Sequence, residues 1–393
     1  MRLPRVSLDR RDVLYALAVS VALPATLAPK GALAAYPIVP IGTVAEKRAA
    51  LVVVEKELKA DPNDPYLFGE KAQLEYDIKT LARNREYVEK IAPEIAAGRA
   101  ARLTSFRLGV PDMAAAVTFW TGGVGAQVLD TRLGPDGRNV TRIGYGPQTL
   151  RAEAGAKFAL ELVEAPRGGD LRPETSVVQY LQLGVPTLRL SQLMNSGGDV
   201  VSAYGWTEVV APGGLPLRVR IDETRRDPFE FVALRTANVK ATVRHYEAMG
   251  MQVVGVSDNK RSLQVQGSYG LKLAKADGDD DAFEPDRESG TVQLNYGDPS
   301  LSTGLLLLPP RKLKATLGLG EPTAELRVVG VPPASAASMA ADGTYPSPEG
   351  LRMPFDAAEA FERSLPSEAL QAVVLSDAMA PERPSASDRF ELL

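Results

Sequence analysis

The sequence predicts an α+β fold of tandem β-α-β-β-β modules that form curved, partly closed mixed sheets, preceded by an N-terminal helical hairpin. Three observations lead to this prediction. A strand with alternating apolar residues and a short helix begin at Ser105. Similar strands recur three more times along the chain, which indicates internal repeats. Short strand-like segments separated by Gly- and Pro-rich turns lie between them. One such module cannot bury both faces of its sheet, so we expect the modules to pair.

The first repeat shows the pattern most clearly. Phe106, Leu108 and Val110 alternate with other residues, as in a strand with one buried face. Asp112 follows in a Pro-Asp turn and is suited to cap a helix that reaches about Trp120. The other three first strands are expected at 180–186, 231–236 and 326–332, and the further strands of the first repeat at 126–129, 139–145 and 158–164.

A helical hairpin is expected ahead of the repeats, within residues 35–100. Thr43 and Glu46 have the spacing of a capping box, so a helix should run from there to about Ala60. Asp64 followed by Pro65 has the pattern of an N-cap and first helical residue and should start the second helix. The apolar stripe is narrow, which favours a satellite that packs on the downstream domains or on a partner.

Composition excludes several classes of function. The chain has 393 residues and a net charge of -4, so there is no electrostatic case for binding nucleic acid. It has no cysteine, which rules out disulfides, thiolate metal sites and a cysteine nucleophile. Its one histidine, His245, is expected on a helix outside the sheet, in a packing or surface role.

Residues 1–34 have the features of a cleaved export signal. A basic start containing Arg10 and Arg11 precedes an apolar run at 13–27, which is too short to span a membrane comfortably. The paired arginines resemble a twin-arginine signal, and an ordinary secretory signal is the alternative. The alanine-rich run resembles the lumen-targeting part of a thylakoid transit sequence. We therefore expect the chloroplast thylakoid lumen, with a bacterial periplasm as the alternative, and no transmembrane span in the mature chain.

The repeat region resembles the vicinal-oxygen-chelate superfamily, which includes glyoxalase I, extradiol dioxygenases and bleomycin-resistance proteins. The resemblance is carried by 105–120, 157–166 and 227–254, and by a closing segment at 347–355. The stretch at 227–254 looks like the join into the second half of tandem glyoxalase chains of the plant type. The resemblance implies one domain of this fold at 101–224 and a second at 225–366, with a C-terminal tail at 367–393.

The same resemblance implies where a divalent metal would be held, and those positions are largely without ligands. The first-strand positions are Ser105, Tyr180, Phe231 and Leu326, and the last-strand positions are Glu161, Leu305 and either Arg220 or Asp222. A catalytic metal site needs about three protein ligands. Glu161 alone cannot supply them, so no cofactor is predicted. If Glu161 points inward, Arg107, Arg218 or Arg220 is the expected counter-ion.

Three functions follow as hypotheses. The leading one is a binding or assembly module with a degenerate metal site, partnered by a membrane-associated photosynthetic complex or by a second copy of itself. The second is a lactoylglutathione lyase of the glyoxalase I type, using zinc, nickel or manganese with Glu161 as a ligand. The third is a metal-free binder of small molecules.

Ala32-Leu33-Ala34 presents small residues in the arrangement that signal peptidases accept. We predict that the mature protein begins at Ala35, which N-terminal sequencing of protein isolated from its source would show. A mature chain that begins at Met1 would contradict this prediction.

Overall fold

The structure is a computed structural model that describes residues 43–134, 137–150, 155–165, 176–185, 199–202, 206–222, 225–256, 290–310, 325–330 and 344–365. The predicted export signal and the predicted tail lie outside these residues. None of the helices in these ranges is long and apolar enough to cross a membrane.

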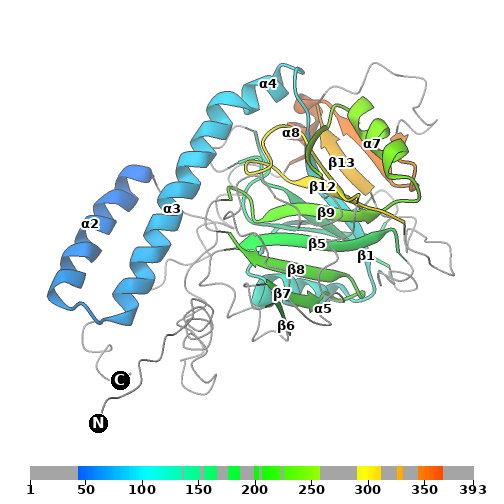
Figure 1. Cartoon of the computed structure of the whole chain (residues 1–393). Coiled ribbons are helices and arrows are strands. Elements are labelled where there is room, and N and C mark those ends of the chain that lie inside the picture. Colours follow the sequence, from blue (N-terminus) through cyan, green and yellow to red (C-terminus); the bar gives the residue numbers. More distant parts are fainter. Residues whose placement is uncertain are drawn as a thin grey trace, which may run out of the picture.

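The helical hairpin forms as the sequence predicts. It consists of α2 (Val44–Ala60) and α3 (Pro65–Lys90), and the short α4 (Ala92–Ala96) follows. Both halves of the capping box are present, with Thr43 and Glu46 each accepting a hydrogen bond from the other's backbone N–H. Asp64 caps α3. In Figure 1, α2 packs along α3 and stands clear of the sheets, while the end of α3 and α4 reach the body of the molecule.

A seven-stranded sheet contains the first and the last modules of the chain. The first module supplies β1 (Arg102–Val110), α5 (Met113–Thr118), a π-helical turn at Phe119–Gly123, β2 (Gln127–Leu133), β3 (Asn139–Gly144) and β4 (Ala159–Glu164). The last supplies β13 (Glu325–Val329), β14 (Thr344–Pro346), β15 (Arg352–Asp356) and α8 (Ala358–Ser364). The strand order is β14-β15-β13-β1-β4-β3-β2. Parallel pairing of β1 with β4 and antiparallel pairing of β1 with β13 make the sheet mixed.

An eight-stranded sheet contains the two middle modules. Its strands are β5 (Val178–Val185), β6 (Asp199–Ser202), β7 (Trp206–Val210), β8 (Pro216–Ile221), β9 (Phe229–Arg235), β10 (Gln252–Val256), β11 (Val292–Asn295) and β12 (Gly304–Leu308). The order is β10-β11-β12-β9-β5-β8-β7-β6, and α7 (Val239–Ala248) lies between β9 and β10 in the chain. Here β5 and β9 meet antiparallel at the junction between modules.

The modules therefore pair in a nested way: the first with the fourth, and the second with the third. The predicted α+β class, with repeated modules in mixed sheets, is confirmed. Each sheet draws strands from both of the predicted domains, 101–224 and 225–366. The division at residue 224 is thus not the division between the two sheets.

One continuous apolar core lies on one face of both sheets. It contains Phe106 and Leu160 from the seven-stranded sheet, Leu181 and Val232 from the eight-stranded sheet, and Trp120 from the turn after α5. A smaller core, with Tyr87, Ile95, Val329 and Phe361 among its members, joins α3, α4 and α8 to the seven-stranded sheet.

Gly304 marks a close approach of backbone to backbone in the eight-stranded sheet. A Cβ atom there would clash with the carbonyl oxygen of Leu294 and lie 2.8 Å from Nδ2 of Asn295.

Because moving backbone atoms aside costs free energy, we expect Gly304→Ala to lower the free energy of unfolding by about 1–3 kcal/mol. Gly69→Ala is the matched control, because that helical site has open space. It should raise stability by about 0.5–1 kcal/mol in the same urea titration. Equal effects would refute this account.

Candidate functional site

A row of alternating charges crosses six strands of the seven-stranded sheet, on the face opposite the core. The residues are direct cross-strand partners, one per strand. From β15 to β2 they are Arg352, Glu325, Arg107, Glu161, Arg142 and Asp130. Cross-strand neighbours of opposite charge stabilise a sheet, and like charges at the same positions would destabilise it. We call this set the charged row.

The strand pattern explains why these residues share a face. Side chains alternate between the two faces of a strand, so a charge between two core residues points away from the core. Glu161 lies between Leu160 and Leu162, and Arg107 lies between Phe106 and Leu108, all four of which belong to the core. The apolar residues thus fix which side the charges occupy.

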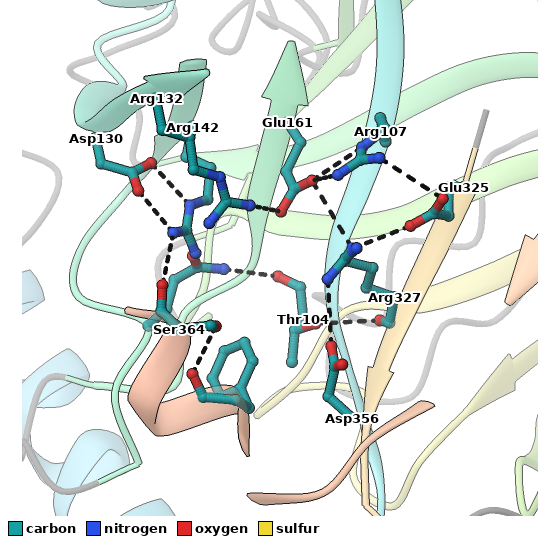
Figure 2. Close-up of polar contacts among 12 residues, drawn as sticks. Thr104, Arg107, Asp130, Arg132, Arg142, Glu161, Glu325, Arg327, Asp356 and Ser364 are labelled. Atoms are coloured by element: carbon teal, nitrogen blue, oxygen red, sulfur yellow. Dashed lines mark hydrogen bonds and ion pairs between the residues drawn. The ribbon is translucent and has the colours of Figure 1, made fainter. Parts of the chain in front are cut away.

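Glu161 is at the centre of the charged row and is almost completely buried, with 3% of its side chain exposed. Its Oε2 accepts hydrogen bonds from Arg107 Nε at 3.0 Å and Nη2 at 2.8 Å. Arg132 Nη2 lies 3.4 Å from its Oε1, and Arg327 Nε lies 3.9 Å from its Oε2. Figure 2 shows these three guanidiniums around the one carboxylate. Arg107 was a predicted counter-ion, whereas Arg132 and Arg327 were not anticipated.

These charges keep Glu161 ionised. Burial opposes ionisation, but the guanidiniums of Arg327, Arg107 and Arg132 outweigh it, and the pKa of Glu161 is lowered. A carboxylate with a lowered pKa is a poor general base at neutral pH. Both oxygens are also already engaged by guanidiniums.

Further ion pairs lie on both sides of Glu161. On one side, Arg327 reaches Glu325 at 3.0 Å and Asp356 at 3.3 Å. On the other side, Arg142 binds Asp130 through two hydrogen bonds of 2.7 and 2.6 Å. Arg142 Nη2 also lies 3.4 Å from the carbonyl oxygen of Ser364, so the end of α8 borders the site, as Figure 2 shows.

The residues at this face do not fit a divalent metal. Ser105 is buried in β1 on the same side as Arg107, and a serine hydroxyl is a weak metal ligand. Glu161 is surrounded by three guanidiniums, whose positive charge would repel a cation. Among the described residues, no three or more His, Cys, Asp or Glu side chains group together as a potential metal site.

Two of the predicted pocket positions lie on the other side of their strands. Leu326 of β13 and Leu305 of β12 both belong to the main core. Leu326 pairs with Phe106, and Leu305 pairs with Val232, which are core residues as well. A shift of one residue moves a side chain to the opposite face, so the neighbours of these leucines occupy the face of interest. In β13 those neighbours are Glu325 and Arg327.

The eight-stranded sheet carries an apolar cluster on its face opposite the core. Tyr180 and Phe231, both predicted pocket positions, are there in edge-to-face contact with ring centroids 6.1 Å apart. The guanidinium of Arg218 lies 3.8 Å from the centroid of the Tyr180 ring. The cluster is buried and comprises Tyr180, Phe231, Ala233, Leu306 and Leu308. At the centre of this face the eight-stranded sheet thus has buried apolar side chains, where the other sheet has the charged row.

A buried ion pair between Arg220 and Glu230 lies beside that cluster. Of these two residues, only Arg220 was among the predicted positions. Arg220 binds both oxygens of Glu230, at 2.6 and 2.7 Å, and reaches Asp222 at 3.0 Å. Glu230 is completely buried; burial opposes its ionisation, yet Arg220 and Arg225 lower its pKa. Gln182 donates a further hydrogen bond to it at 2.8 Å. Arg220 and Asp222, the candidates for the unassigned last-strand position, thus pair with each other.

His245 lies on α7, as expected from the sequence, and is half-buried. Burial lowers its pKa, against an opposing effect from Glu349. Its ring makes an edge-to-face contact with Tyr246, whose hydroxyl is completely buried. Neither residue lies at any of the positions discussed above.

Comparisons with known proteins find solved structures that are similar at low sequence identity. No family model and no curated protein sequence matches the chain. Glyoxalase I from Zea mays is similar over 67% of this chain and 95% of its own, with 17% identity and a TM-score of 0.49. A putative dioxygenase from Bacillus subtilis covers 72% of this chain and 97% of its own, with 11% identity and a TM-score of 0.42. At these values the fold assignment depends on the strand order of the chain itself.

Glu161→Gln should show how strongly the charged row depends on its central carboxylate. Removing one partner of a buried ion pair leaves uncompensated charges, so we expect a loss of about 3–5 kcal/mol in the free energy of unfolding at neutral pH. Because the folded-state pKa is lowered, the contribution of Glu161 is present above its ordinary pKa of 4.5 and is lost as pH falls below it. The deficit of the variant should therefore shrink in acid.

The control is Glu89→Gln, which alters an exposed ion pair with Arg85. It should change stability by less than about 1 kcal/mol at any pH. Denaturant titrations of the three proteins at several pH values make the comparison. A Glu161→Gln deficit that stays constant from neutral to acid pH would contradict the role given to its charge.

Proposed function

We propose that this protein is a metal-independent binding and assembly module of the vicinal-oxygen-chelate type, exported to the thylakoid lumen. The observation that best supports the proposal is that three arginine side chains lie around Glu161. Glu161, the carboxylate that matches a last-strand metal position of this type of fold, is paired with Arg107, Arg132 and Arg327. A bacterial periplasm is the alternative compartment, since either destination fits the export signal.

The helical hairpin supports the assembly part of the proposal. Val52 and Val53 on α2 and Phe68 on α3 are exposed by 65%, 49% and 54%. Isolated exposed apolar residues are ordinary, but these lie on an element that stands away from the body of the molecule (Figure 1). The partners we propose for it are a membrane-associated photosynthetic complex or a second copy of the chain.

A metal-free small-molecule binder is the second candidate, and a different observation favours it. The apolar cluster around Tyr180 and Phe231 is on the sheet face opposite the core. Two buried amide atoms on that face, Oε1 of Gln182 and Nε2 of Gln293, have no hydrogen-bond partner among the described residues. An elongated, mainly apolar molecule with a polar group at each end would satisfy both amides.

Metal analysis of the purified mature protein tests metal independence. We expect no stoichiometric metal by mass spectrometry, and no lactoylglutathione formation after addition of zinc, nickel or manganese. A stoichiometric metal with turnover that Glu161→Gln abolishes would overturn the proposal in favour of a glyoxalase I activity. Native mass spectrometry of the same sample tests the second candidate. A bound small molecule would appear as added mass that is absent from the Phe231→Ala variant.

The assembly surface is tested with the double variant Val52→Ser/Val53→Ser. Its matched control is Ala45→Ser/Ala49→Ser, which also changes two exposed positions of α2. We expect the first variant, but not the control, to lose self-association in analytical ultracentrifugation or co-sedimentation with washed thylakoid membranes. If the unmodified protein is monomeric and does not sediment with membranes, the assembly role is refuted.

A further inference from the structure

Three basic side chains are buried together where α3 meets the two sheets. Arg102, Lys157 and Arg226 are exposed by 2%, 1% and 1%. Arg102 and Arg226 both donate to the carbonyl oxygen of Ala156. Lys157 donates to the carbonyl oxygen of Arg226 and to Oδ1 of Asn84 on α3, the latter at 3.1 Å. We call this set the cationic junction.

Among the described residues, the junction has little compensating negative charge. The carboxylate that acts on both Lys157 and Arg226 is Asp227. Its two oxygens are used by backbone groups, accepting from Phe158 N at 2.6 Å and Phe229 N at 3.2 Å. Arg226 stacks on the ring of Tyr87 at 4.0 Å, a contact that stabilises a cation without neutralising it. Burial and the neighbouring guanidinium of Arg226 lower the pKa of Lys157 well below its usual range. Burial of uncompensated charge is costly, so two guanidiniums that face one carboxylate among the described residues need a further partner.

The hydrogen-bond count shows the same deficit. Arg102 Nε, Arg226 Nε, Asn84 Nδ2 and the hydroxyl of Tyr87 are buried and have no partner among the described residues. Each of these atoms is able to donate. Asn84 and Tyr87 are one turn apart on α3, so they present their side chains to the same place. Donors therefore outnumber acceptors at a site that already carries excess positive charge.

We propose that the cationic junction binds one small anion of the chloride or bromide class. Such an ion supplies a negative charge and an acceptor for several N–H and O–H groups, and the described part of the junction is short of both. Buried water would satisfy the donors but not the charge. The near-complete burial of the surrounding side chains favours a monatomic ion over a larger oxyanion. The ion would fasten α3 to the turns before β4 and β9.

Bromide crystallography of the full mature chain tests this site directly. We expect one anomalous bromide peak within hydrogen-bonding distance of Asn84 Nδ2 and Arg226 Nε. Ordered water in that place, or no density, would overturn the proposal. This measurement needs no variant and remains decisive if the variants below do not fold.

Thermal unfolding in chloride and in gluconate, at equal ionic strength, tests the energetic role. The Tm of the unmodified protein should rise linearly with the logarithm of chloride concentration and stay flat in gluconate. Asn84→Asp places a carboxylate at the junction and should abolish the chloride dependence. Asn63→Asp adds the same charge at an exposed site and should keep it. A bromide peak without any chloride-dependent Tm would mean an adventitious ion only, and would also overturn the proposal.

Discussion

The alternation of charge across six strands is the constraint on which the seven-stranded sheet depends. The four inner members of the charged row each lie between two neighbours of opposite sign, and strands in a sheet are about 4.8 Å apart. A slip of one strand by two residues would keep the core leucines on their face, yet it would break the match of charges. The hydrophobic pattern thus sets the face of each strand, and the ions set its register.

Each of the two sheets contains a buried carboxylate that is paired with an arginine from another strand. In the seven-stranded sheet a carboxylate on β4, Glu161, is held by an arginine on the adjacent strand β1. In the eight-stranded sheet an arginine on β8, Arg220, holds the carboxylate of Glu230 on β9. Both carboxylates have lowered pKa values despite their burial. Burying such a pair costs free energy, and so does breaking it once it is buried. These pairs therefore favour one arrangement of strands over others more than they raise the stability of the fold.

Much of the local structure was accessible from the sequence, and the reasons lie in short-range chemistry. The capping box at Thr43 and Glu46, the N-cap at Asp64 and the first strands of the modules all follow from neighbouring residues. The nested pairing of modules does not, because the strand beside β1 begins at Glu325. Arg327 was missed as a partner of Glu161 for that reason. Leu326 was matched to Ser105 as a first-strand position, yet it pairs with Phe106 and belongs to the main core. An error of one residue in matching two strands moves a side chain to the opposite face.

The nested arrangement also dictates the order in which a growing chain can fold. The eight-stranded sheet uses a nearly contiguous segment, from β5 to β12, so its strands can meet as soon as they leave the ribosome. The seven-stranded sheet must wait for β13, and until then β1 presents an unpaired edge. Closing that sheet brings together segments separated by most of the chain, which is a slow step by the logic of contact order. A ribosome that stalls after Leu308 would release one complete sheet and half of another, with an edge open to aggregation.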